Sequence, residues 1–243
     1  MRKNDRIMRI IMSAALIVAM IIWAWEAASL QAEYVWGQNT DVDFRDMDIC
    51  VVLDAGHGGK DPGKVGITGC YEKDINLKIT EKLKIFLELE GIRVVLTRDG
   101  DYGLYSETDA VKKTADMRNR VSLIEQTEPD LVISIHQNSY SDGSIKGAQT
   151  FYYSDSKKGK ELAGFLQDRL VYTLDNNNHR KEKANDNYYL LKNTNCPIVI
   201  VESGFLSNEE ECKLLQSEVY QEKVAWAVYM GIMQYLNANL NTK

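Results

Sequence analysis

The chain has 243 residues, of which 44% are hydrophobic and 26% are charged, so it is long enough for one well-packed globular domain. Its formal net charge is −6, and because the first nine residues are basic, the remainder is more acidic than this total suggests. An acidic body argues against a nucleic-acid-binding protein, which needs a basic surface to contact phosphates. Specific recognition by this chain therefore has to come from a defined site.

The four cysteines have no C-x-x-C spacing, which argues against a zinc ribbon, and the chain is too long for a disulfide framework to be expected. Cys50 and Cys196 adjoin apolar runs, so we expect them to be small buried hydrophobic residues. One pairing among Cys50, Cys70, Cys196 and Cys212 stays open if the protein works outside the cytoplasm.

Residues 1–32 predict a signal peptide or a membrane anchor. Residues 10–25 carry no charge, and as a helix they would span roughly 24 Å, short of the roughly 30 Å hydrocarbon core. Ala27-Ala28-Ser29 offers a cleavage site, whereas the tryptophans at 23 and 25 suit the interface around an uncleaved anchor. Both alternatives predict an exported or membrane-anchored, extracytoplasmic protein. Residues 33–48 are polar and acidic, as in a linker, and one folded domain is expected over 49–238.

Within that domain, apolar runs typical of strands alternate with helical periodicity. We expect a loop at 175–187, and Ser207-Asn208-Glu209-Glu210 is a capping-box pattern that starts a short helix. This alternation predicts an α/β fold, a single domain with a mainly parallel twisted sheet flanked by helices. The expected strands are 49–54, 94–97, 131–136, 147–153, 188–191 and 198–202, and the longer expected helices are 74–90, 116–126, 157–174 and 219–236.

Three of the apolar runs lead directly to side chains that bind metals or transfer protons. The first run is followed by His57, the second ends at His136, and the third ends at Glu202. Ligands of an open parallel sheet bind beyond the carboxyl ends of its strands, so these three side chains are expected to meet. Glu72, at the mouth of the first helix, is the fourth candidate.

The glycine-rich stretch 56–61 does not match a phosphate-binding loop. It lacks the third glycine of a dinucleotide fingerprint, and Asp54 and Asp61 occupy positions where a P-loop requires Gly and Ser or Thr. The glycines instead allow a sharp turn that points His57 into the cleft.

Three of the four candidates also have an ordinary structural explanation when each is taken alone. His57 suits a turn, His136 suits a satisfied core histidine, and Glu72 is favourable near a helix N-terminus without any metal. Glu202 is harder to explain, because an unpaired buried carboxylate after four β-branched residues would cost several kcal/mol. Two histidines and two glutamates at strand ends together favour a zinc hydrolase.

The chemistry of zinc suggests a division of roles. A catalytic zinc keeps one coordination position open, and His57, Glu72 and His136 supply a three-residue ligand set. Glu202 is then free to collect a proton from water and pass it to the leaving nitrogen. The converse, with Glu202 as ligand and Glu72 as base, remains open.

The motifs around these residues resemble the zinc-dependent N-acetylmuramoyl-L-alanine amidase family over residues 49–236. The resemblance implies one bound zinc ion, with His57, Glu72 and His136 as its ligands and Glu202 as the catalytic glutamate. It also implies a peptidoglycan substrate, with Arg98, Arg118 and Asn138 at positions that help to hold it. The motifs are Val52-Leu53-Asp54-Ala55-Gly56-His57-Gly58-Gly59, Glu72-Lys73-Asp74, Leu96-Thr97-Arg98, Ser134-Ile135-His136-Gln137-Asn138 and Val201-Glu202-Ser203-Gly204-Phe205-Leu206-Ser207-Asn208.

The layout, an N-terminal membrane segment and one catalytic domain without wall-binding repeats, is similar to the spore-cortex branch of that family. That likeness implies a role in muramic-δ-lactam formation, a location in the intermembrane space of the forespore, contact with the membrane through residues 1–32, and control by an accessory sporulation protein. Two alternatives stay open: a peptidoglycan metallopeptidase of the same fold, and a non-catalytic peptidoglycan-binding module.

Overall fold

The computed structural model describes residues 12, 20, 44 and 47–240. The strands and helices named here all belong to one unit of the chain, Asp43–Lys243. Apart from residues 12 and 20, the predicted signal peptide or anchor (1–32) lies outside the described residues, as does most of the predicted linker (33–48). Within the described part of the chain, no helix has the length and hydropathy that crossing a membrane requires.

The described domain contains one sheet whose strands lie in the order β2-β1-β3-β6-β4-β5. β2, β1, β3 and β6 are parallel, β4 is antiparallel to β6, and β5 is parallel to β4. The predicted single α/β domain with a mainly parallel sheet is therefore confirmed. The elements are β1 (Cys50–Ala55), α2 (Glu72–Leu89), β2 (Arg93–Leu96), α3 (Lys112–Thr127), β3 (Leu131–Asn138), β4 (Gln149–Tyr152), α4 (Lys157–Leu174), β5 (Lys183–Ala184), α5 (Tyr189–Asn193), β6 (Ile198–Phe205), α6 (Glu209–Leu215) and α7 (Glu218–Leu240).

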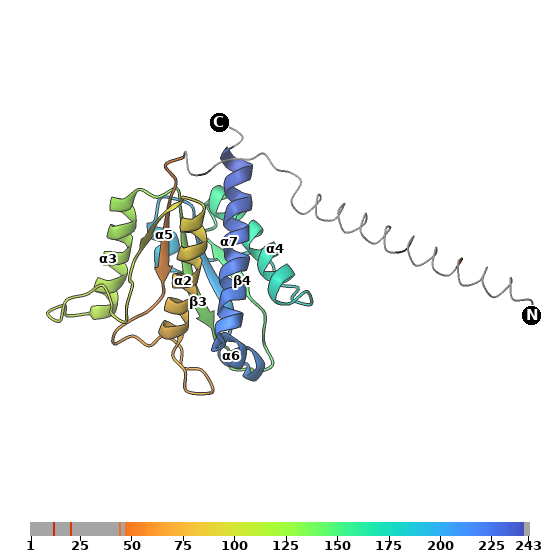
Figure 1. Cartoon of the computed structure of the whole chain (residues 1–243). Helices are drawn as coiled ribbons and strands as arrows, with labels where there is room; N and C mark the ends of the chain where they lie inside the picture. The colour runs from red at the N-terminus through yellow and green to blue at the C-terminus, as the bar shows by residue number, and fades with distance from the viewer. Residues whose placement is uncertain (1–11, 13–19, 21–43, 45–46, 241–243) are drawn as a thin grey trace, which may run out of the picture. The chain divides into compact units, whose positions relative to one another are not determined.

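Helices cover both faces of the sheet, which is why the central strands β1, β3 and β6 are buried along most of their length. α2, α4 and α7 lie on one face, and α3 and α5 lie on the other (Figure 1). The apolar residues that α2 buries recur once per turn, and these are Ile75, Ile79, Leu83 and Leu87. On the opposite face, side chains of the sheet, α3 and α5 form a second apolar cluster: Val52, Ile124, Val132, Phe151, Leu190, Leu191, Ile198 and Ile200.

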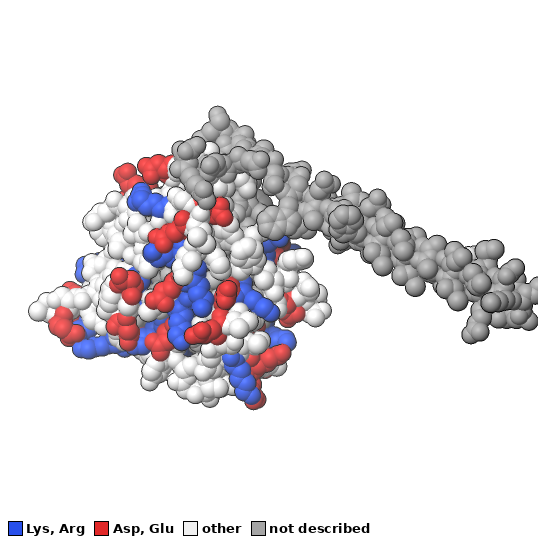
Figure 2. All heavy atoms as spheres, viewed as in Figure 1, with Lys and Arg blue, Asp and Glu red and all other residues white. Residues whose placement is uncertain are grey.

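Acidic and basic side chains alternate on the surface above α2 and α7, as Figure 2 shows. One exposed pair of this kind joins Lys84 to Glu88 within α2, with 2.6 Å between Nζ and Oε2. Pairs of this type add little stability, so the fold depends on its apolar layers.

Two local expectations are wrong. Residues 188–191, expected as a strand, instead begin helix α5, because Leu190 and Leu191 both turn into the apolar cluster beside α3. The expected loop 175–187 contains the short strand β5. The start of α6 also differs in detail: Asn208, not Ser207, caps it by accepting a hydrogen bond from the Glu211 N–H.

The sheet register explains why the candidate side chains meet. His136 on β3 is the register partner of Glu202 on β6, and Asp54 on β1 is the partner of Ser134 on β3. Side chains two residues apart share a face, so Asp54, His136 and Glu202 lie on the face that carries α3 and α5. This common face, at the carboxyl ends of adjacent strands, forms the floor of the candidate site.

Candidate metal centre and active site

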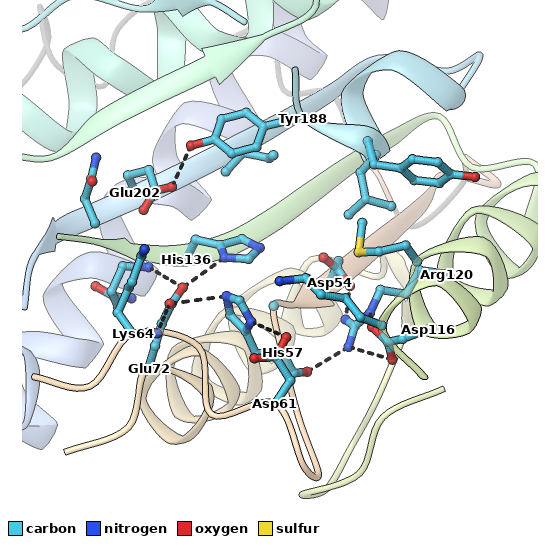
Figure 3. A pocket seen from close by; sticks show the side chains of 18 of the residues that line it. Asp54, His57, Asp61, Lys64, Glu72, Asp116, Arg120, His136, Tyr188 and Glu202 are labelled. Carbon is cyan, nitrogen blue, oxygen red and sulfur yellow. Dashed lines mark hydrogen bonds and ion pairs between the residues drawn. The ribbon is translucent and has the colours of Figure 1, made fainter. Parts of the chain in front are cut away.

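Three side chains from three separate elements converge at this edge of the sheet (Figure 3). His57 follows β1, Glu72 is the first residue of α2, and His136 lies in β3. His57 Nε2 is 3.2 Å from Glu72 Oε2, and His136 Nδ1 is 2.9 Å from Glu72 Oε1. One donor atom of each residue lies within 4.8 Å of the other two, which is close enough for all three to hold one ion.

The turn that presents His57 has an unusual backbone conformation. His57 has a φ of 65°, and Gly58 and Gly59 that follow also have positive φ values. A left-handed conformation is unfavourable for a residue with a Cβ, so surrounding contacts must hold it. Two buried arginines, Arg120 and Arg98, supply those contacts.

Arg120 on α3 donates from Nη2 to the His57 carbonyl at 2.7 Å and from Nη1 to the Ala55 carbonyl at 2.9 Å. Its charge is balanced by Asp54 and Asp116, both in direct contact with the guanidinium. Burial raises the pKa of Asp54, but Arg120 and the hydroxyl of Ser134 outweigh this and lower it to about 2. A buried ion pair therefore anchors the turn that carries His57.

Arg98 supports the same turn from the other side. It donates from Nε to the Ala55 carbonyl at 2.8 Å and from Nη2 to the carbonyls of Gly56 at 3.1 Å and Lys73 at 2.8 Å. The side chain is 1% exposed. Arg98 thus joins the His57 turn to the first turn of α2.

Two glycines are required by the closeness of the ligands. A Cβ on Gly56 would lie 2.2 Å from the His136 ring, and one on Gly63 would lie 2.5 Å from Glu72 Oε2. Gly63 also has a φ of 68°. Both positions therefore need a residue without a side chain for the three ligands to approach one another.

Glu72 is a buried carboxylate with both oxygens occupied by donors. Oε1 accepts from the Gln137 N–H at 3.0 Å, and Oε2 accepts from the Lys64 N–H at 2.8 Å. Burial raises its pKa, but hydrogen bonds with His136 and His57 outweigh burial and hold the pKa of Glu72 far below its ordinary value. Glu72 is therefore an ionised, fixed carboxylate, as a metal ligand needs to be.

Further residues fix the orientation of the ligands. His57 Nδ1 lies 2.9 Å from Asp61 Oδ2, and a proton donated there leaves the lone pair on Nε2 facing Glu72. The Asn76 amide donates to the Gly56 carbonyl at 3.1 Å and accepts from the Gln137 amide at 3.1 Å. Such contacts hold ligand side chains in place before an ion binds.

Glu202 lies in the same cavity but in a different environment. It is 6% exposed, its Oε1 accepts a hydrogen bond from the Tyr188 hydroxyl at 3.2 Å, and its Oε2 has no hydrogen-bond partner among the described residues. Burial and the charge of Glu72 raise its pKa. Glu202 is therefore a carboxyl group suited to gaining and losing a proton.

The cavity has a volume of about 460 Å³. Ligand residues lie at one end of it, the α5 segment forms part of its wall, and Lys64 and Lys113 add positive charge. The lining residues are Asp54, Gly56, His57, Asp61, Lys64, Glu72, Lys113, Asp116, Met117, Arg120, His136, Gln137, Asn138, Ser139, Asn187, Tyr188, Tyr189, Leu190, Ile200 and Glu202.

Of the three residues predicted to hold substrate, only Asn138 lines this cavity. Arg98 is buried behind the His57 turn, where main-chain carbonyls accept its hydrogen bonds. Arg118 is exposed on α3 and does not line the cavity. Arg98 therefore supports the site from behind, and a contact of the exposed Arg118 with substrate, outside this cavity, stays a prediction.

The sequence reasoning did not identify Arg120, Tyr188, Asp61 or Asn76. Arg120 had a detectable signal, because Asp116, Arg120 and Ile124 are spaced by four residues and share one face of α3. Asn76 similarly lies one turn after Glu72 on α2. Tyr188 had no such signal in the sequence, because its hydrogen bond to Glu202 depends on the turn that leads into α5.

The chemistry of the converging donors fits a zinc ion. Two imidazoles and one carboxylate are a common catalytic ligand set for zinc, whereas magnesium and calcium prefer sites built mainly from oxygen atoms. The glycines beside the donors and the fixed orientation of Glu72 agree with a preformed site of this kind.

Comparisons with known proteins identify the family of this chain. Residues 51–234 match the family model described as N-acetylmuramoyl-L-alanine amidase. The germination-specific N-acetylmuramoyl-L-alanine amidase of Bacillus subtilis (strain 168) is 39% identical over 188 residues, 76% of this chain and 78% of that protein.

Solved structures extend the likeness to the fold. The CwlD amidase of Clostridioides difficile, solved in complex with the GerS lipoprotein, is 44% identical with a TM-score of 0.77, over 79% of this chain and 100% of that one. AmiC2 of Nostoc punctiforme, an N-acetylmuramoyl-L-alanine amidase, is 31% identical with a TM-score of 0.68, over 78% of this chain and 98% of that one. With its converging His57, Glu72 and His136, the chain belongs to the N-acetylmuramoyl-L-alanine amidase family.

Proposed function

We propose that the protein is a zinc-dependent N-acetylmuramoyl-L-alanine amidase, which hydrolyses the amide between the lactyl group of N-acetylmuramic acid and the L-alanine of a peptidoglycan stem peptide. The observation that carries the proposal is the convergence of His57, Glu72 and His136 in a cavity that also contains Glu202. One carboxyl oxygen of Glu202 has no hydrogen-bond partner among the described residues. Family membership supports the same reaction.

In this proposal His57, Glu72 and His136 hold the zinc ion. When bound, zinc supplies Lewis acidity, which polarises an amide carbonyl and lowers the pKa of a water molecule. Glu72 suits the ligand role because it is ionised and both of its oxygens are fixed by donors. This contrast with Glu202 favours the assignment over its converse, in which the two glutamates exchange roles.

Glu202 acts as the proton carrier. It accepts a proton from the water that attacks the lactyl carbonyl carbon, and it then donates that proton to the L-alanine nitrogen as the carbon–nitrogen bond breaks. The products are a lactyl carboxylate on the glycan and a free amine on the peptide. The raised pKa of Glu202 makes its carboxylate a stronger base for the first step, and the Tyr188 hydroxyl holds the carboxyl group in one orientation.

Digestion of purified sacculi tests the reaction, with the fragments identified by mass spectrometry. The proposal expects free stem peptides and peptide-free glycan chains. Fragments cut within the stem peptide would instead indicate a metallopeptidase, and intact sacculi with bound protein would indicate a non-catalytic module. Either result overturns the proposal.

We also propose that the protein acts outside the cytoplasm in spore-cortex maturation, where peptide removal precedes muramic-δ-lactam formation. Support comes from the Bacillus subtilis relative, which is named germination-specific, and from the Clostridioides difficile neighbour, which was solved with a lipoprotein. A comparable accessory sporulation protein, attachment through residues 1–32 and a location in the forespore intermembrane space are parts of this proposal.

Expression of the chain in Bacillus subtilis that lacks its own germination-specific amidase tests the cortex role. Muropeptide analysis of the spores is expected to recover muramic-δ-lactam with the intact chain and not with Glu202→Gln. Absence of lactam, in cells where the purified protein still cleaves sacculi, would separate the cortex role from the reaction and contradict only the former.

A further inference from the structure

Two cysteines from distant parts of the sequence lie side by side at the metal-ligand loop, residues 56–71, which carries His57 and leads into Glu72. Cys70 lies in the loop between β1 and α2, two residues before Glu72, and Cys212 lies in α6. Their sulfur atoms are 3.7 Å apart. A contact this close, between residues separated by 142 positions, makes them the candidate pair among the four cysteines.

The surroundings leave the two sulfurs free to approach. A Cβ on Gly66 would lie 2.6 Å from Cys70 Sγ and 2.9 Å from Cys212 Sγ, so both sulfurs pack against a glycine without a side chain between them. Cys212 is fully buried, whereas Cys70 is only partly buried. Cys70 is therefore the thiol that a dissolved reagent can reach first.

The loop is already held by other contacts against residues that flank α6. The Ile67 N–H donates to the Leu206 carbonyl at 3.1 Å, and Gln216 Nε2 donates to the Thr68 hydroxyl at 2.9 Å. A disulfide requires the sulfurs at about 2.05 Å, so they have to move about 1.6 Å closer than their present separation of 3.7 Å. The two hydrogen bonds already hold the two segments side by side.

We propose that Cys70 and Cys212 form a disulfide that clamps the metal-ligand loop to α6 when the protein is outside the cytoplasm. The inference takes from the proposed function only the extracytoplasmic location, where disulfides persist. It does not depend on amidase activity, since the bond forms between two groups outside the cavity lining.

The oxidant is a disulfide, either a low-molecular-weight one or that of a dithiol oxidoreductase. The Cys70 thiolate attacks one sulfur of that disulfide and releases the other as a thiolate, which leaves a mixed disulfide on Cys70. The Cys212 thiolate then attacks Cys70 Sγ and releases the second oxidant thiolate. The two protein thiols are thereby oxidised by two electrons, and their two protons pass to the two reduced oxidant thiols.

The cross-link encloses a large part of the domain and ends next to a proposed ligand. Cross-links across long loops restrict the unfolded chain most strongly, and this one also limits movement of the segment that leads into Glu72. The oxidised protein is therefore expected to resist unfolding and to resist proteolysis after the exposed Lys64, in the same loop.

The test uses the full-length protein, purified in detergent with reductant and then equilibrated with glutathione disulfide. Oxidation is expected to lower the intact mass by about 2 Da and to raise the Tm by about 5–15 °C. Because one tryptic peptide contains both Cys196 and Cys212, the linkage is mapped in Cys196→Ser, which is expected to form the same bond to Cys70.

Cys70→Ser, altered at the partly exposed position, is the matched variant and is expected to show neither change. Four free thiols after oxidation of the folded wild type, or a bond to Cys50 or Cys196, would overturn the inference. Zinc content and sacculus cleavage are measured on the same samples. A linked but inactive protein would contradict only the proposed amidase, and an active protein without the bond would contradict only the clamp.

Discussion

The Arg120 guanidinium donates to the main-chain carbonyl of His57 at 2.7 Å, and both residues line the same cavity. Arg120 is paired with Asp54, which in turn accepts from Ser134 of the neighbouring strand at 2.6 Å. A candidate ligand in a strained conformation is thus supported by a buried charge network rooted in the sheet.

Removal of Arg120 is expected to destabilise the fold strongly. Arg120→Ala leaves the buried carboxylate of Asp54 without its partner, a change that typically costs about 3–5 kcal/mol in the free energy of unfolding. Urea denaturation measures this. Arg118→Ala, two residues away on the exposed face, is the control and should change stability by less than about 0.5 kcal/mol. Equal effects of the two substitutions would contradict the assigned roles.

Asp54 gives the network a pH dependence. Its pKa is lowered to about 2 from an ordinary 3.8, so its contribution is fully present above about pH 4 and is lost as the pH falls toward 2. Asp54→Asn lacks this titration. The difference in unfolding free energy between wild type and Asp54→Asn should therefore shrink by about 2 kcal/mol between pH 4 and pH 2. A difference independent of pH would show that Asp54 is not held ionised by Arg120.

Gly56→Ala tests how closely the ligands approach. The new methyl group would lie 2.2 Å from the His136 ring, so that ring has to move. We expect activity on sacculi to fall by about 10²-fold, because displacements near 1 Å have effects of this size. Gly164→Ala in α4, where an added Cβ meets no atom within 4 Å, is the matched control and should keep full activity. Wild-type activity in Gly56→Ala would contradict the described geometry.

The Tyr188 hydroxyl is expected to influence the pH profile through Glu202. Its hydrogen bond to Oε1 favours the ionised carboxylate, so Tyr188→Phe should raise the pKa of Glu202 further. If ionised Glu202 is the base, the acidic limb of the kcat/KM profile moves to higher pH, and Tyr172→Phe on exposed α4 leaves it unchanged. An unmoved limb in Tyr188→Phe would remove Glu202 from the role of base.

The residues of the candidate site could be predicted because buried strands are recognisable from short runs of apolar residues in the sequence. Four β-branched residues before Glu202 and the apolar run before His136 fix two buried parallel strands, and their carboxyl ends have to lie at one edge. Glu72 could be predicted because the periodicity of α2 places it at the helix start. These inferences needed no information on distant contacts.

Other features could not be predicted, because tertiary contacts determine which side chains are buried and which short apolar runs form strands. Arg118 and Arg120 are about 200° apart around a helix, and only the position of α3 on the sheet determines which one is buried. Similarly, Leu190 and Leu191 form a short apolar run that suits a strand or a helix equally well. The part of the cavity wall that α5 forms could therefore not be predicted from the sequence.

The central claim is that His57, Glu72 and His136 hold one zinc ion that Glu202 faces without binding it. Zinc content per chain, measured by elemental mass spectrometry on folded wild type, Glu202→Gln and His136→Ala, tests it most directly. The account predicts about one zinc in wild type and in Glu202→Gln, and loss of the metal in His136→Ala. Zinc loss in Glu202→Gln together with retention in His136→Ala would contradict it.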